Sequence, residues 1–135
     1  MRKILLFFLL GVTGCIGWGD MQKSRKLSGN YYLFAMDSDI ENMNLSESDD
    51  RIGFTPIVDK VVYAAGINDK YIIVKQHPNN DRSTTNYYIL PLKGSANYRT
   101  NNGLMGPLTL QQFNQIEKEL DIATLPFTIV YKELE

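Results

Sequence analysis

Short apolar runs separated by polar turn residues make up most of the chain from Ser28 onward. The runs are rich in Tyr, Val, Ile and Phe, and clusters of Asn, Asp, Gly and Pro lie between them, which is typical of β-strands joined by turns. The pattern predicts strands at residues 31–36, 60–66, 71–75, 87–90 and 127–131, and a weaker strand around residues 40–45. Polar connections are expected at residues 37–39, 46–51, 79–86 and 93–105.

The most distinct pair of runs, residues 60–66 and 71–75, flanks Asn68 and Asp69. β-Branched runs on both sides of an Asn-Asp turn predict a β-hairpin. Both runs are apolar at successive positions, so we expect them to be central strands that are covered on both faces. Pro91 predicts that the run 87–90 lies at an edge of the sheet or ends there.

One helix is predicted in the C-terminal half of the chain. Thr109 is suited to be its N-cap, and Gln112 completes a capping box three residues later. Residues at three- to four-residue spacing form its expected buried stripe: Leu110, Phe113, Ile116 and Leu120. The side chains expected to face water are Glu117, Lys118 and Glu119. The predicted fold is therefore α+β, with an antiparallel sheet of about five to six strands, one C-terminal-half helix packed on it, and a last strand.

The N-terminus has the features of a signal peptide. Arg2 and Lys3 supply positive charge, and residues 4–10 form a continuous apolar run that ends at Gly11. A transmembrane helix needs about 20 apolar residues to cross the bilayer. The run is too short for that, so we expect an export signal rather than a membrane span.

The stretch Val12-Thr13-Gly14-Cys15 resembles a bacterial lipobox, and the chain is similar in layout to small bacterial lipoproteins of uncharacterised families. The resemblance implies that a diacylglyceryl group is attached to the Cys15 sulfur, that the chain is cut after Gly14, and that the new amine receives a fatty acyl group such as palmitate. Two or more acyl chains give stable membrane anchoring. The resemblance thus implies a protein held on the extracytoplasmic side of a membrane in the cell envelope.

These features divide the chain into three parts. Residues 1–14 are the expected signal peptide, residues 15–27 the lipidated cysteine and a flexible tether, and residues 28–135 a single globular domain. Loss of the signal peptide leaves 12 basic against 15 acidic residues, a net charge of −3 with no basic stripe. Nucleic acid is therefore not an expected partner.

Few residues offer catalytic or metal-binding chemistry. Cys15 is the only cysteine and His77 the only histidine, which excludes a disulfide, a thiolate metal site and a His-rich zinc site. We expect His77 to be partly exposed, with a local hydrogen bond, rather than catalytic. No cofactor is expected.

The acidic residues Asp37, Asp39 and Glu41 begin like a calcium-binding loop. The pattern then departs from that loop, because Asn42 stands where a glycine is needed and Ser48 where a bidentate glutamate should be. Solvated turn residues are the favoured interpretation, with calcium as the alternative. The eight tyrosines would indicate a contact surface only if several were exposed together.

The function expected from the sequence is a membrane-tethered, non-enzymatic protein-binding or assembly module in the cell envelope. It would contact membrane lipid through acylated Cys15 and a protein partner through its domain. The alternative is an inhibitor or immunity-type lipoprotein against a hydrolase or toxin, with the acidic loop at residues 46–50 as a substrate mimic. A carboxylate-based hydrolase is the third hypothesis, and it requires two acids about 5–10 Å apart in a groove.

Overall fold

The computed structural model describes residues 22–49, 53–95, 98 and 103–135, and its strands form two antiparallel sheets. The first sheet has the order β1-β2-β3-β4, with β1 (Gln22–Ser28), β2 (Tyr31–Met36), β3 (Asn44–Glu47) and β4 (Thr55–Val58). The second has the order β8-β7-β6-β5-β9, with β5 (Val62–Ile67), β6 (Tyr71–Gln76), β7 (Asn86–Pro91), β8 (Met105–Leu108) and β9 (Ile129–Val130). The helical elements are α1 (Leu110–Glu119) and the 3-10 turns η1 (Ile40–Asn42), η2 (Pro78–Asn80) and η3 (Lys132–Leu134).

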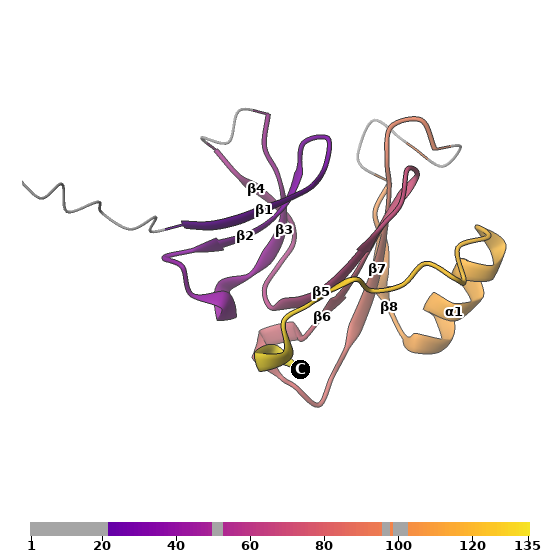
Figure 1. Ribbon diagram of the computed structural model, residues 1–135. Coiled ribbons are helices and arrows are strands. Elements are labelled where there is room, and N and C mark those ends of the chain that lie inside the picture. Colours follow the sequence, from indigo (N-terminus) through magenta and orange to yellow (C-terminus); the bar gives the residue numbers. More distant parts are fainter. Residues whose placement is uncertain (1–21, 50–52, 96–97, 99–102) are drawn as a thin grey trace, which may run out of the picture.

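The molecule has three layers, with the second sheet in the middle (Figure 1). The first sheet covers one face of the second, and their shared core contains Leu33, Leu45, Ile72 and Leu90. Helix α1 covers the other face, where Phe113 packs in one cluster with side chains of β6 and β7. Successive residues of β6 therefore enter different cores, which explains why this strand is apolar at successive positions.

The α+β class, the helix and the final strand are confirmed, and the fold is mostly β. The arrangement of strands differs from the predicted sheet of about five to six strands, because the described residues form nine strands in two sheets. The strands without a sequence signal are β1, β4 and β8, and each lies at the edge of its sheet. Edge strands are short, polar or interrupted by proline, so they lack the apolar pattern that reveals central strands.

The predicted tether at residues 15–27 is too long at its C-terminal end. Residues 22–28 form β1, which pairs antiparallel with β2 from Gln22 opposite Met36 to Ser28 opposite Tyr31. Gly29 has a φ of +53° in the two-residue connection, a conformation that glycine adopts without steric cost. The strand escaped prediction because its polar side chains suit an exposed edge as well as a linker.

The hairpin of β5 and β6 is confirmed, and both strands are central and buried. Its turn is fixed by Asn68, whose Oδ1 accepts hydrogen bonds from the backbone N–H of Lys70 at 2.8 Å and of Tyr71 at 2.7 Å. An asparagine that bonds to the backbone a few residues later stabilises a tight turn. Asn68 therefore predicts the turn because its side chain forms the hydrogen bonds that stabilise it.

The capping box of α1 is confirmed. Thr109 Oγ1 accepts from the Gln112 N–H at 3.2 Å, and Gln112 Oε1 accepts from the Thr109 N–H at 2.9 Å. Two assignments on the helix were wrong: Leu110 is 54% exposed and Glu117 is only 8% exposed. Glu117 lies one helical turn after the buried Phe113, so it shares the face that packs on the sheet.

Burial raises the pKa of the Glu117 carboxyl above its ordinary value. A raised pKa in the folded state gives stability that is complete below the ordinary value of 4.5 and is lost as the pH rises through the folded value. We therefore expect Glu117→Gln to raise the free energy of unfolding near neutral pH and to leave it nearly unchanged below pH 4.5. Urea unfolding at the two pH values measures this difference.

The matched control for that measurement is Glu119→Gln, because Glu119 is exposed on the same helix. Its effect should be small at both pH values. An increase for Glu117→Gln of the same size at both pH values would contradict burial as its cause.

In the part of the chain that the structure describes, no helix is both long and apolar enough to span a membrane.

Candidate functional site: a cavity between the two sheets

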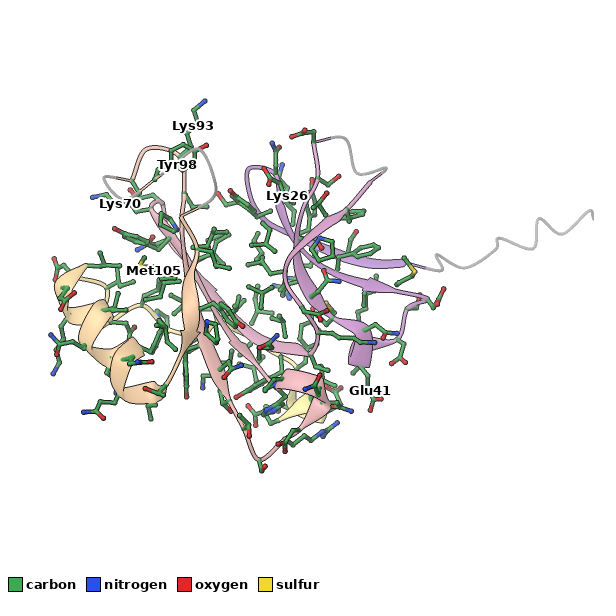
Figure 2. All side chains as sticks on the ribbon, turned by 180° about the vertical axis from the view of Figure 1, so that it is seen from behind. Lys26, Glu41, Lys70, Lys93, Tyr98 and Met105 are labelled. Atoms are coloured by element: carbon green, nitrogen blue, oxygen red, sulfur yellow. The ribbon has the colours of Figure 1, made fainter. Side chains whose placement is uncertain are left out.

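A cavity of about 250 Å³ lies between the two sheets, where the β1–β2 and β5–β6 hairpins turn side by side. Its walls come from four separate segments of the chain. The lining residues are Ser28, Gly29, Asn30, Tyr31, Glu47, Asp69, Leu92, Lys93 and Tyr98. Lys93 and Tyr98 are seen at this end of the molecule, with Lys70 and Lys26 on either side (Figure 2). We call this site the inter-sheet cavity.

The wall from the first sheet is held by hydrogen bonds between the β1–β2 turn and the end of β3. Asn30 Nδ2 donates to Asp49 Oδ1 at 2.8 Å, and the Ser48 N–H donates to the Asn30 carbonyl at 2.8 Å. These bonds join the turn to the residues directly after Glu47. The Glu47 backbone is thus held beside the cavity by these bonds and by its pairing with Tyr31 and Thr55.

The wall from the second sheet is held in the same way. The Leu92 N–H donates to the Lys70 carbonyl at 2.7 Å, which joins the end of β7 to the β5–β6 turn that carries Asp69. The chain then turns back, because the Ser95 N–H donates to the Leu92 carbonyl at 2.9 Å and the Tyr98 N–H to the Ser95 carbonyl at 3.1 Å. This turn brings the Tyr98 ring to the cavity.

The electrostatics of the cavity centre on Tyr31. Burial raises the pKa of the Tyr31 hydroxyl, and the nearby Glu47 carboxylate and Tyr98 hydroxyl raise it further. The raised pKa keeps the Tyr31 hydroxyl protonated at physiological pH, and Glu47 lines the same cavity. Asp69 adds a second acid and Lys93 one base to the same lining.

The cavity has the chemistry to bind a cation. Small-molecule pockets usually have volumes of about 300–1,000 Å³, so this smaller space suits one side chain or one small group. A carboxylate beside aromatic rings favours an ammonium or guanidinium group through charge-assisted hydrogen bonds and cation–π contact. His77 follows the opposite end of β6, so the one histidine is not placed to act as a base here.

The predicted local hydrogen bond of His77 is confirmed, since Nδ1 lies 2.9 Å from the Thr84 carbonyl oxygen. The predicted partial exposure is wrong, because the side chain is only 3% exposed. The imidazole stacks on the Tyr63 ring at a centroid distance of 4.1 Å. Its buried Nε2 has no hydrogen-bond partner.

The acidic residues suspected of calcium binding make local contacts in the turn after β2 and in η1. Asp39 Oδ1 accepts from the Glu41 N–H at 3.0 Å and caps η1, and the Glu41 carboxylate lies 3.8 Å from Arg82. Asp37 is the first of two residues with positive φ in the turn after β2. Among the described residues, no group of three or more Asp, Glu, His or Cys side chains could hold a metal ion.

The acidic segment at residues 46–50 is only partly a loop. Ser46 and Glu47 belong to β3, and the side chains of Ser46 and Ser48 are buried. Asp49 is exposed, while Asp50 lies outside the described residues, as do Cys15 and the rest of the lipobox. The tyrosines do not form an exposed patch, because Tyr31 and Tyr32 are buried and Tyr98, at 39%, is the exposed one.

From the sequence, Glu47 belonged to the acidic segment at residues 46–50, and no pattern placed it beside Asp69, Lys93 or the tyrosines. The five acidic, basic and aromatic side chains of the lining come from four segments that are far apart in the chain, around residues 31, 47, 69 and 93–98. The sequence feature that pointed to this site was the Asn68-Asp69 pair, which predicted a polar turn at the tip of the β5–β6 hairpin. Only the packing of the two sheets brings that tip beside the β1–β2 turn.

Comparison with known proteins gives one family. A family model described as "Protein of unknown function (DUF3997)" matches residues 28–134. The match covers the residues of the inter-sheet cavity and helix α1. Neither a curated protein nor a solved structure matches the chain. The chain therefore belongs to the DUF3997 family of proteins of unknown function.

Proposed function

We propose that the protein is a membrane-tethered, non-enzymatic binding module of the bacterial cell envelope. The lipobox motif supports a lipid on Cys15 as the tether. The inter-sheet cavity receives a basic side chain of a partner protein. The observation that carries the binding role is the convergence of Tyr31, Glu47 and Tyr98 in the lining of one cavity.

Charge and shape favour a basic side chain over an acidic one. Within the lining itself Glu47 and Asp69 outnumber Lys93, Lys26 and Lys70 lie outside the lining on either side of it (Figure 2), and the two tyrosines add aromatic surface. A hydrogen bond to a charged group contributes about 1.5–3 kcal/mol. One such bond to Glu47 therefore gives a binding preference of about tenfold or more.

The same cavity bears on the hydrolase hypothesis, because Glu47 and Asp69 are two acids that line one site. A carboxylate glycosidase must also hold sugar rings on both sides of the bond that it cleaves. A cavity of about 250 Å³ is better matched to a single side chain. Binding is therefore the role that the volume supports.

The inhibitor hypothesis depends on an acidic loop that protrudes from the surface. Ser46 and Glu47 are instead paired within the sheet, and Asp49 accepts a hydrogen bond from Asn30. These contacts leave the inter-sheet cavity, rather than a free loop, as the better supported binding feature.

A capture experiment tests the role of the cavity. Full-length, tagged protein is purified from native membranes after chemical crosslinking, and the recovered partner is quantified. We expect Glu47→Gln to reduce recovery about tenfold or more, since the charge-assisted hydrogen bond is lost. Glu119→Gln is the control, because it removes an exposed acid from α1, away from the cavity.

Equal recovery with Glu47→Gln and Glu119→Gln would contradict the proposed site. Circular dichroism of both variants shows whether the fold is retained. Glu47 is only half-buried, so we expect both variants to fold.

A further inference from the structure

Strand β1 carries a run of basic side chains at the edge of the first sheet. Lys23, Arg25 and Lys26 are exposed, and no carboxylate among the described residues forms an ion pair with any of them. Lys23 Nζ lies 5.7 Å from the centroid of the Tyr131 ring, which is a cation–π contact. The strand therefore carries three exposed positive charges, with Lys23 and Arg25 on the face of the sheet that bears Leu33, and Lys26 on the opposite face.

The acids near β1 do not cancel this charge. Asp37 directly follows Met36, which pairs with Gln22 at the start of the strand. The carboxylate of Glu41, four residues after Asp37, forms an ion pair with the Arg82 guanidinium at an N–O distance of 3.8 Å. The strand itself thus carries three bases and no acid, and Asp37 is next in the chain to the residue that pairs with its first residue.

The position of β1 in the chain places it close to the proposed lipid. Seven residue steps separate Cys15 from Gln22, and an extended chain spans about 3.5 Å per residue, so β1 begins within about 25 Å of the lipid attachment. The first sheet is the layer that the chain enters from its N-terminus, and α1 is on the far side of the molecule (Figure 1). A lipid on Cys15 thus keeps β1 within about 25 Å of the membrane, whereas α1 lies beyond both sheets.

We infer that β1 lies on the membrane surface and that Lys23, Arg25 and Lys26 bind anionic lipid headgroups. The inference rests on the lipid tether of the proposed function. Basic residues at an anionic membrane surface each favour contact, and three together favour this orientation by a factor on the order of 100. Lysine and arginine side chains are long enough to reach the surface from either face of an edge strand.

Charged residues on an edge strand also prevent pairing with other chains. That role does not depend on the composition of the membrane, whereas headgroup binding does. Lipid composition is therefore the variable that separates the two roles.

The test uses full-length, lipidated protein reconstituted into vesicles of phosphatidylcholine alone or of equal parts phosphatidylcholine and phosphatidylglycerol. Lysines are acylated with a small amount of an amine-reactive ester, and mass spectrometry gives the rate at each site. We expect Lys23 and Lys26 to react about tenfold more slowly on the anionic vesicles, with the difference abolished by high salt. Lys118 on α1 should react equally on both.

A charge variant sharpens the test. Arg25→Gln removes one of the three bases and leaves Lys23 and Lys26 as reporters, so their protection should fall about fivefold. Lys118→Gln, the matched control, should leave the protection of Lys23 and Lys26 on anionic vesicles unchanged.

The mass of the Cys15 peptide distinguishes a failure of the lipid tether from a failure of the proposed membrane orientation. Lipid on Cys15 with equal acylation of Lys23 on both vesicles, or protection of Lys118 instead, would overturn the membrane orientation and leave the tether standing. A Cys15 peptide without lipid would overturn the tether and this inference with it.

Discussion

Replacement of Gly66 by alanine is expected to lower the free energy of unfolding by about 3 kcal/mol. Gly66 lies in β5, and a Cβ at this position would overlap the Pro126 carbonyl oxygen and come within 2.9 Å of Ile73 Cγ1. The Pro126 oxygen belongs to the backbone and cannot rotate away. The chain segment between α1 and β9 would therefore have to move, and this segment closes the core on the helix side.

Gly53→Ala is the matched control, because a Cβ at Gly53 would have no atom within 4 Å. Its effect should stay within about 0.5 kcal/mol, as for surface substitutions. Urea unfolding followed by circular dichroism measures both variants. Equal stability of the two would show that the Pro126 segment does not pack against β5 as described.

Cys15→Ala is expected to abolish lipid attachment and to move the protein from the membrane fraction to the soluble fraction. Each buried acyl CH₂ contributes about 0.8 kcal/mol to membrane binding, so loss of two or more chains removes the anchor almost completely. The fold should be unaffected, since the core residues belong to the two sheets and the helix. Fractionation, together with the mass of the N-terminal peptide, measures the outcome.

The control for this prediction is Ser24→Ala, which changes an exposed residue of β1 and leaves the lipobox intact. It should remain with the membranes. A Cys15→Ala protein that still sediments fully with membranes would contradict the lipid anchor.

Much of the fold could be predicted because its signals are local. The run 31–36 coincides with β2, the Asn68 turn joins β5 and β6, and Thr109 with Gln112 forms the N-terminal capping box of α1. Each of these depends on residues that are neighbours in the chain, so a single sequence contains the information. The burial of β5 and β6 on both faces could also be inferred from their continuous apolar character.

The remaining features depend on contacts between distant segments. The sequence shows that both faces of β6 are covered, but it does not show that one cover is a second sheet. Helical spacing predicted that Leu110 and Phe113 share the buried face of α1. In the structure the face of the helix that contacts the sheet includes Glu117 and leaves Leu110 exposed. The inter-sheet cavity could not be predicted, because Glu47, Asp69 and Tyr98 meet only when the two sheets pack together.

Site-specific photocrosslinking in native cells tests the proposed binding module most directly. A benzoylphenylalanine is introduced in place of Tyr98, at the cavity, or in place of Leu110, which is exposed on α1. We expect one discrete crosslinked species in the membrane fraction from position 98, none from position 110, and loss of that species with Glu47→Gln. No crosslinked species from position 98, or the same species from both positions, would contradict the inter-sheet cavity as the binding site.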